Sequence, residues 1–168
     1  LFAPRRRADT GQPPRQDRAR GQGRQRPKDN PFVGQAGALP EIWSYGHRNG
    51  QGATWGPDGQ LWMHEHGAQG GDEINLPQPG RSYGWPQISH GVNYGGSPVG
   101  TGKSAAPGME QPLHHWTPSI APSGMAFLTS DRYGPAWQGN LFVGSLKFQY
   151  LNRIELKDGK VAAEHKLL

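Results

Sequence analysis

Glycine and proline are the residues that most limit what this chain can fold into. The 168 residues include 26 Gly and 16 Pro, so a quarter of the positions hold residues that break helix interiors. A helical bundle and a long coiled coil are therefore excluded. Six Trp, five Tyr and five Phe can supply buried apolar area. This pattern favours an all-β fold of short strands and many turns, of about one domain in length.

The first 29 residues form a segment of different composition. Residues 3–30 contain no Val, Ile, Leu, Trp, Tyr or Phe and consist largely of Arg, Gln, Gly and Pro. Such a stretch cannot bury enough apolar surface to offset its chain entropy. We therefore expect residues 1–29 to be a disordered, low-complexity segment and residues 30–168 to hold the folded unit.

The basic charge of the chain comes from this segment. Residues 1–30 hold eight Arg and one Lys against three Asp, a net charge of +6, whereas the whole chain carries +5. The remaining 138 residues therefore carry −1. Clustered Arg can neutralise nucleic-acid phosphates, but no aromatic side chain interleaves with these Arg to stack on bases. The sequence therefore disfavours nucleic acid as a partner.

No segment of the sequence predicts a membrane span, a signal peptide or a disulfide. No apolar run approaches the roughly 18 residues that a membrane helix needs. Residues 1–4 precede three Arg, whereas a signal peptide places its positive charge before an apolar core. The chain has no Cys, which excludes disulfides, thiolate metal sites and a thiol nucleophile.

Two antiparallel units are predicted from side-chain alternation and turn residues. The first pairs residues 53–55 with residues 61–64 across a Pro-Asp-Gly turn. The second contains strands at 139–145, 150–156 and 161–168, the last two joined by a Lys-Asp-Gly-Lys turn.

A short internal similarity suggests that the two units are repeats. Residues 59–62 and 139–142 both read Gly, amide, Leu, aromatic. Repeated small sheets are typical of a β-propeller, although a β-sandwich fits this pattern nearly as well. Residues 77–125 between the units are rich in Gly and Pro and show few strand signals, so we expect a long loop with a functional role.

The densest polar cluster is the segment 45–52, Tyr-Gly-His-Arg-Asn-Gly-Gln-Gly. Arg48 offers a planar fork of donors for carboxylates, and Asn49 adds a neutral donor and acceptor. The glycines allow a ligand to approach the backbone closely. The cluster therefore suits a planar, acidic ligand. The alternative is a loop in which Arg48 only bridges two backbone carbonyls.

A second cluster covers residues 64–73. Strand alternation places His64 and His66 on one face, but zinc at this pair would need a third ligand. The glycine-rich loop before Asp72 and Glu73 suits calcium better, because calcium takes many oxygen ligands, including backbone carbonyls. The alternative is a solvated acidic turn.

Aromatic residues and one lysine complete the candidate features. The rings in residues 83–86 and 90–94 suit the faces of sugars, although a ring in a turn-rich fold can also belong to the core. Lys147 follows an apolar strand, which would place its ammonium at the strand's end, where ligand sites often form. The alternative for Lys147 is a surface lysine, the commonest location of this residue.

Taken together, these segments resemble the soluble pyrroloquinoline quinone (PQQ)-dependent aldose sugar dehydrogenases of the glucose/sorbosone dehydrogenase family. The order and spacing of five strings carry the resemblance, which runs from about residue 30 to the end. These strings are Tyr-Gly-His-Arg-Asn-x-Gln-Gly (45–52), Glu-His-Gly-x-x-Gly-Gly-Asp-Glu-Ile-Asn (65–75), Tyr-Gly-Trp-Pro (83–86), Ala-Pro-Ser-Gly-Met-Ala-Phe (121–127) and Gly-Ser-Leu-Lys (144–147). The family fold is a six-bladed β-propeller with PQQ over its central channel, so we expect this chain to cover about half of one.

The resemblance implies two cofactors, PQQ and calcium. Six side chains would contact PQQ: Arg48, Asn49, His66, Asp72, Ser119 and Lys147. Arg48 would stabilise charge on the quinone oxygen, and Ser119 and Lys147 would bind cofactor carboxylates. The carbonyls of Gly67 and Ala68 would hold the calcium that polarises PQQ. Glu73 and the carbonyl of Tyr83 would form a second, structural calcium site.

The implied reaction is the oxidation of an aldose at its anomeric carbon to a lactone, with the electrons passed to an external acceptor such as a quinone or cytochrome. The resemblance also implies a periplasmic or secreted location. The family's catalytic His is expected upstream of Leu1, and its later arginines beyond Leu168, so this chain would be an incomplete fragment. The alternative is a non-catalytic propeller fragment that binds calcium and carbohydrate.

Three departures from the family pattern stand out. Gly50 replaces the usual Pro after Arg-Asn, and Arg5 to Arg7 replace an expected Gly-Asp at a strand end. The Arg/Gln run that follows replaces a further strand. A shifted reading frame in residues 1–29 would produce such a run, and translating the gene in the other two frames tests this.

Overall fold

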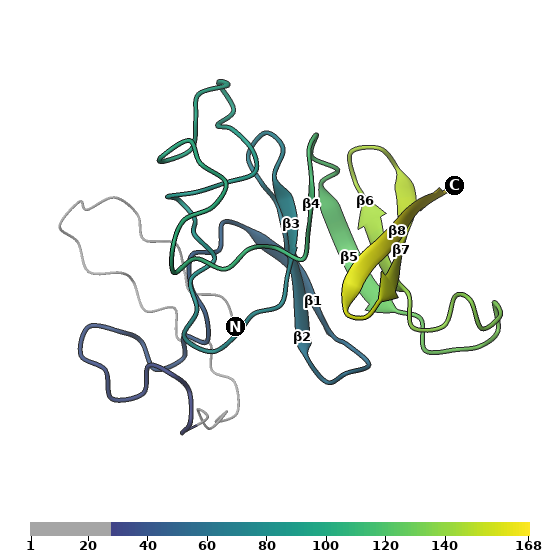
Figure 1. Ribbon diagram of the computed structural model, residues 1–168, viewed down its shortest axis with the longest axis horizontal. Coiled ribbons are helices and arrows are strands. Elements are labelled where there is room, and N and C mark those ends of the chain that lie inside the picture. Colours follow the sequence, from purple (N-terminus) through teal and green to yellow (C-terminus); the bar gives the residue numbers. More distant parts are fainter. Residues whose placement is uncertain (1–27) are drawn as a thin grey trace, which may run out of the picture.

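The computed structural model describes residues 28–168, so most of the predicted low-complexity segment, residues 1–27, lies outside the described residues. The described part contains eight β-strands and no helix. The strands are β1 (Gly50–Trp55), β2 (Leu61–Glu65), β3 (Asp72–Asn75), β4 (His114–Trp116), β5 (Pro122–Phe127), β6 (Leu141–Ser145), β7 (Tyr150–Lys157) and β8 (Lys160–Leu167). They form two four-stranded antiparallel sheets, β1 to β4 and β5 to β8, each in chain order (Figure 1).

Local sequence accounts for the hairpins. β1 pairs with β2 across the Pro-Asp-Gly turn, and β7 pairs with β8 across Asp158-Gly159, as predicted. Asp158 and Gly159 have φ angles of 53° and 72°, which is the left-handed conformation that matches the twist of two-residue hairpins. The internal similarity is also confirmed: residues 59–62 and 139–142 lead into the second strand of each sheet, β2 and β6.

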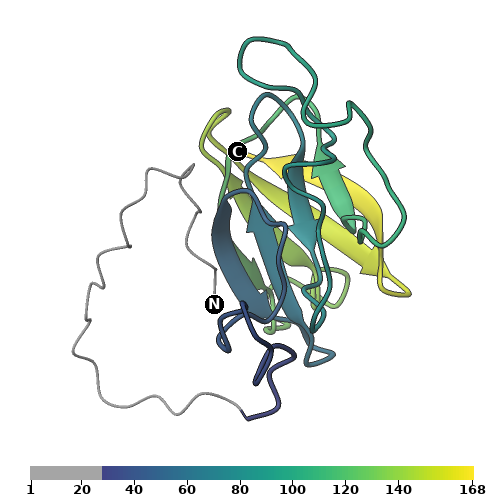
Figure 2. The same cartoon turned by 90° about the vertical axis from the view of Figure 1, so that its left-hand side faces the viewer.

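The prediction of one loop over residues 77–125 is wrong in part. His114–Trp116 forms β4, which completes the first sheet, and Pro122–Phe127 forms β5, which begins the second. β3 was not predicted either, because the preceding glycines suggested a loop. These strands are short or interrupted by Pro and Gly, so pairing with neighbouring strands stabilises them more than local propensity does. The connection that remains, residues 76–113, is a long loop beside the first sheet (Figures 1 and 2).

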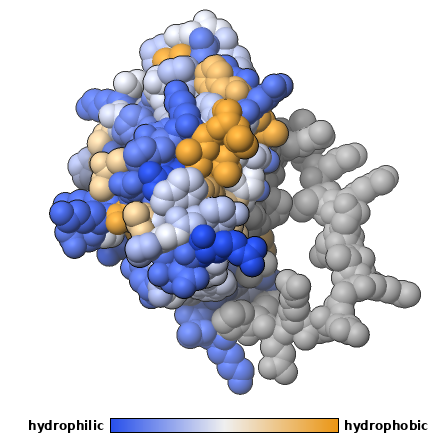
Figure 3. All heavy atoms as spheres, turned by 90° about the vertical axis from the view of Figure 1, so that its right-hand side faces the viewer, coloured by the Kyte–Doolittle hydropathy of each residue, from blue (hydrophilic) through white to orange (hydrophobic). Residues whose placement is uncertain are grey.

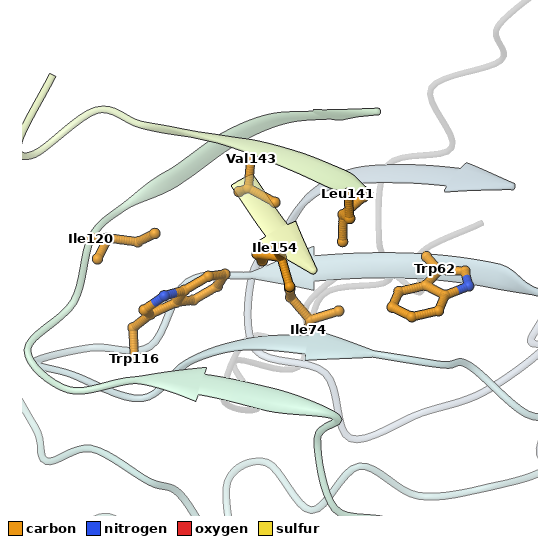
Figure 4. Close-up of a cluster of buried hydrophobic side chains, with 7 residues drawn as sticks. All are labelled: Trp62, Ile74, Trp116, Ile120, Leu141, Val143 and Ile154. Carbon is orange, nitrogen blue, oxygen red and sulfur yellow. The ribbon is translucent and has the colours of Figure 1, made fainter. Parts of the chain in front are cut away.

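The two sheets share one hydrophobic core. In Figure 4 the rings of Trp116 and Trp62 lie on either side of Ile74 and Ile154, which come from different sheets. The buried cluster comprises Trp62, Ile74, Trp116, Ile120, Leu141, Val143 and Ile154. Burial of such side chains contributes about 2 kcal/mol each. Because the core lies between the sheets, neither sheet buries its apolar face without the other.

The sheets meet along both their first and their last strands. β1 lies against β5, and side chains of β4 reach Glu164 on β8. Two sequential four-stranded meanders placed side by side in this way are neighbouring blades of a β-propeller. The predicted all-β propeller is therefore confirmed, with this chain forming part of one.

A carboxylate ties the sheets together at the outer strands. Glu164 on β8 accepts hydrogen bonds from His114 Nε2 at 3.1 Å and Trp116 Nε1 at 3.0 Å, both on β4. It also accepts one from Asn152 Nδ2 at 2.6 Å on β7. We call this group the outer tie. Its hydrogen bonds, chiefly that from His114, lower the pKa of Glu164 to about 2.

The side of the second sheet is largely hydrophilic but carries a compact hydrophobic patch (Figure 3). Its edge strand, β8, alternates exposed and half-buried residues. Val161 on this strand packs against the core.

Within residues 28–168 we find no helix with the length and hydrophobicity needed to cross a membrane.

Candidate functional site

Arg48 lies at the centre of the first polar cluster. Its Nη1 donates to the carbonyls of His66 and Gly67 at 3.0 and 2.7 Å. Its Nη2 donates to the hydroxyl of Tyr94 at 3.3 Å, and the guanidinium lies 5.2 Å from the ring centre of Trp85. The carbonyl bridge is the contact that the alternative interpretation of this loop predicted. However, Nε is buried without a partner, so the guanidinium keeps one donor for an additional acceptor.

The loop that leaves β2 brings His66 and Asn49 together. The backbone N–H of His66 donates to the carbonyl of Asn49 at 3.0 Å, and His66 Nε2 donates to the carbonyl of Pro122 at 2.7 Å. His64 is fully buried and lies beside Ser123, so both imidazoles face the second sheet, as alternation predicted. Burial lowers the pKa of His64. Among residues 28–168, no group of three or more His, Cys, Asp or Glu side chains could hold a metal such as zinc.

Asp72, at the start of β3, is the hydrogen-bond centre between the two sheets. Its Oδ1 accepts from the backbone N–H of Gly67 at 2.8 Å. Its Oδ2 accepts from Ser119 Oγ at 2.6 Å and from the N–H groups of Ile120 and Ala121 at 2.8 and 2.9 Å. We call this group the inner tie. Asp72 is fully buried, so it fixes the loop before β5 against the loop after β2.

Close backbone packing around the inner tie explains the glycines of the second cluster. A Cβ on Gly67 would lie 1.9 Å from the carbonyl oxygen of Gly70. Gly71 has a φ of 72°, and a Cβ there would lie 2.5 Å from the N–H of Gly91. Only glycine fits these positions. The carbonyls of Gly67 and half-buried Ala68 are therefore presented by a rigid loop.

The structure brings Ser119 and the backbone of Lys147 to the same end of the sheets. The hydroxyl proton of Ser119 is donated to Asp72, so Ser119 would have to turn its hydroxyl to donate to a ligand. The N–H of Lys147 donates to the carbonyl of Ile120 at 3.2 Å, and its ammonium is exposed, 5.1 Å from the ring of Phe148. Hydrogen bonds therefore connect Arg48, through the inner tie, to the segment that carries Lys147.

A second polar group surrounds Glu65, the last residue of β2, which is 3% exposed. Its Oε1 lies 3.0 Å from His47 Nδ1 and accepts from Asn75 Nδ2 at 2.9 Å. Its Oε2 accepts from the N–H groups of Arg48 and Asn49. The Glu65 carboxylate therefore fixes the backbone of the Arg48-Asn49 segment.

Glu73 lies beside Glu65, and we call the two the acidic pair. Asn75 Nδ2 donates to both carboxylates, at 3.1 Å to Glu73 and 2.9 Å to Glu65. Burial, together with the charge of Glu65, raises the pKa of Glu73 to about 7. Both carboxylates line a cavity of about 20 Å³ that Tyr83 also lines. A space of this size holds about one water-sized group. A cation bound there would favour the ionised form of Glu73.

Tyr83 closes the cavity and is held on two sides. Its hydroxyl donates to the carbonyl of Leu76 and accepts from the N–H of Gln78. Its ring stacks on His47 with 4.5 Å between the ring centres. Burial raises the pKa of Tyr83. Arg48 and His66 also line the cavity, so a cation such as calcium would depend on the oxygen atoms of the acidic pair and of the nearby backbone carbonyls.

Comparison with known proteins identifies the family. Residues 18–168 match the Glucose / Sorbosone dehydrogenase family. The chain belongs to this family. It is 46% identical over 144 residues to the Aldose sugar dehydrogenase YliI of Escherichia coli (strain K12), which covers 84% of this chain and 38% of the relative. The resemblance found from the sequence is therefore confirmed.

Solved structures of family members agree with the fold. A crystal structure of a glucose dehydrogenase superimposes with a TM-score of 0.81 at 51% identity, over 85% of this chain and 42% of the other. The PQQ-bound form of Aldose Sugar Dehydrogenase from Streptomyces coelicolor superimposes with a TM-score of 0.58 at 30% identity, over 84% and 36%. The chain thus spans about two fifths of the length of these relatives.

Three contributors to the site were not predicted as site residues. Glu65 stands inside a matching string, but its four hydrogen bonds depend on how three loops meet. His47 likewise lies in the first polar cluster, without a pattern that indicates its carboxylate partner. Tyr94 was noted only as one aromatic among several, since its contact with Arg48 spans 46 positions of sequence.

Proposed function

We propose that this chain is part of a PQQ- and calcium-dependent enzyme that oxidises an aldose at its anomeric carbon to a lactone and passes the electrons to an external acceptor. Family membership and the PQQ-bound relative support a quinone cofactor. The observation that carries the proposal is Arg48, which is held by the carbonyls of His66 and Gly67 and keeps a buried Nε without a hydrogen-bond partner. By analogy with the family, the proposed location is the periplasm or the exterior of the cell.

PQQ fits the chemistry of these residues. When bound, it supplies a planar quinone that accepts two electrons from the sugar, and it carries carboxylates that require cations. Arg48 would direct its free donor at an acceptor oxygen and stabilise negative charge that develops there. Lys147 would pair with a carboxylate, as would Ser119 once its hydroxyl turns from Asp72. Asn49 and His66 would line the same site.

Asp72 has a different proposed role from the one expected. All four of its hydrogen bonds are made within the protein, and its side chain is fully buried. It would therefore act by positioning Gly67 and Ser119 and would not itself contact the cofactor. In this proposal Asp72 remains a residue of the site, as expected, but it acts through the residues that it positions.

Calcium fits two places. Glu73 and the carbonyl of Tyr83 would hold one ion at the cavity of the acidic pair, where a cation would relieve the repulsion between two buried carboxylates. The carbonyls of Gly67 and Ala68 would hold a second ion beside the cofactor. Arg48 already donates to the Gly67 carbonyl, so an ion there would share that oxygen with the guanidinium or displace it.

Titration with PQQ and calcium tests the proposal. Binding is followed by the quinone absorbance, and turnover by reduction of a dye in the presence of aldoses. Arg48→Ala should weaken PQQ binding at least about tenfold, the equivalent of one lost charge-assisted hydrogen bond. Arg81→Ala is the matched control, because Arg81 is an exposed arginine paired with Glu110. Equal affinities of both variants would refute the role of Arg48.

Reading binding and turnover separately also distinguishes the alternative function. PQQ and calcium binding with dye reduction by an aldose would support the enzyme. Calcium and sugar binding with no PQQ uptake would instead support a non-catalytic calcium- and carbohydrate-binding propeller part.

A further inference from the structure

We infer that Tyr94 is a sugar-contacting residue of this site, in which its exposed ring packs against the face of the pyranose. The inference rests on the proposed function, since it places the sugar beside Arg48. Tyr94 belongs to the long loop between β3 and β4, 46 positions from Arg48 in the sequence. Nothing in the sequence pattern brings these two residues together.

The backbone that carries Tyr94 is held firmly. Val92 and Gln69 form an antiparallel bridge with hydrogen bonds of 3.0 and 3.1 Å, which fixes the loop to the segment after β2. Asn93 then closes a tight turn: its N–H donates to the carbonyl of Ser97 at 2.9 Å, and its side chain donates to the carbonyl of Pro98 at 2.8 Å. Little conformational entropy remains to be lost when a ligand meets a ring mounted in this way.

The ring itself is largely free. Tyr94 is 78% exposed, although its hydroxyl accepts from Arg48 Nη2 at 3.3 Å and its ring centre lies 5.7 Å from the guanidinium carbon. The side chain is therefore oriented by its polar end while most of its apolar surface faces solvent. An aromatic ring with one fixed polar edge and an open face is suited to the C–H groups of a sugar ring.

Both Trp85 and Tyr94 lie near the guanidinium of Arg48, but only Tyr94 has a ring open to a substrate. The ring of Trp85 lies 5.2 Å from the guanidinium but is half-buried, and the backbone N–H of Trp85 donates to the carbonyl of Gly46 at 2.8 Å. Trp85 therefore supports Arg48 from the protein side. Two other exposed rings lie at the other end of the sheets (Figure 1): Trp55, 69% exposed, ends β1, and Tyr133, 63% exposed, belongs to the β5–β6 connection.

Saturation-transfer NMR on the full chain tests the inference, with PQQ and calcium present and glucose as the probe. Tyr94→Ala should weaken glucose binding about tenfold, the effect of losing one aromatic contact of about 1.4 kcal/mol. Tyr94→Phe should keep wild-type glucose binding, because the ring remains and only the bond to Arg48 is lost. Tyr133→Ala is the matched control and should leave glucose binding unchanged.

The outcomes separate this inference from the proposed function. A wild-type chain that takes up no PQQ would refute the proposed function, which the quinone absorbance reports without any sugar. PQQ uptake with equal glucose signals in wild type and folded Tyr94→Ala would overturn the role of Tyr94 alone. A loss of glucose binding in Tyr94→Phe equal to that in Tyr94→Ala would also overturn it, because the hydroxyl would then be the essential part.

Discussion

Two carboxylates of this protein have opposite pKa shifts, although both side chains lie among hydrogen-bond donors of neighbouring strands. Glu164, in the outer tie, has a pKa lowered to about 2, chiefly by the hydrogen bond from His114. Glu73, in the acidic pair, has a pKa raised to about 7, chiefly by burial and then by the charge of Glu65. The first group is stabilised as an anion by its three donors. The second shares one amide with a like charge.

The difference distinguishes a carboxylate whose charge is compensated within the fold from one whose charge is not. The outer tie is electrostatically complete, so its charge stabilises the contact between the sheets. The acidic pair is less well compensated: its two carboxylates share one amide. The guanidinium of Arg48 also lines the cavity, but it donates to two backbone carbonyls and to Tyr94 instead. Strongly shifted pKa values of this second kind are more typical of functional sites.

The largest effect is expected from Glu65→Gln. This substitution removes the charge that accepts from the N–H groups of Arg48 and Asn49 and pairs with His47. Because Glu65 is buried, the free energy of unfolding should fall by about 3 kcal/mol. Urea denaturation measures this loss. A variant as stable as wild type would show that the Arg-Asn segment does not depend on Glu65.

The next effect is expected from calcium and depends on pH. Between pH 4.5 and 7 the folded protein retains a proton on Glu73 that the unfolded chain has released. The stability of calcium-free protein should therefore fall as pH rises through this window. Calcium at 100 times its Kd should add about 2.7 kcal/mol at pH 8, and less at pH 5, where protons compete for Glu73. Thermal unfolding with calcium or a chelator measures both.

Glu73→Gln is the control for the calcium effect. It should remove both the fall in stability between pH 4.5 and 7 and most of the gain from calcium. An undiminished gain in this variant would place the stabilising ion elsewhere.

The smallest effect is expected at the outer tie, from Glu164→Gln. The pKa of Glu164 is depressed, so its contribution is present above pH 4.5 and is lost as pH falls toward 2. A quarter of the side chain is exposed, so solvent screening limits the loss at pH 7 to about 1 kcal/mol. Urea denaturation at pH 7 and pH 3 measures it, and calcium should have no influence. A calcium-dependent loss would contradict the distinction between the two groups.

Much of the fold could be predicted because its strongest elements are local. The β1–β2 and β7–β8 hairpins carry turn residues between alternating segments, and those signals do not depend on the rest of the chain. β4 and β5 could not be predicted in the same way. Three residues with two His, and a strand that begins with Pro, become strands only because a neighbouring strand pairs with them.

Candidate site residues could be proposed from residue type and order, but the contacts among them could not. Arg48 and Gly67 lie in matching strings, whereas Ser119 was assigned by the resemblance outside them. The structure connects the three through Asp72. The commitment of the Ser119 proton to Asp72 depends on how the two sheets pack. The contact of Tyr94 with Arg48 depends on the course of a long loop, for which the sequence contains no periodic signal.

The junction between the two blades and the candidate site both depend on the inner tie. One carboxylate orients both the glycine loop and the segment that leads to β5. A substitution of Asp72 would therefore affect both the packing of the two sheets and the candidate site. A substitution at the rim of the propeller would affect only the packing. Over evolution, the residues of the outer strands can therefore change while the inner tie stays the same.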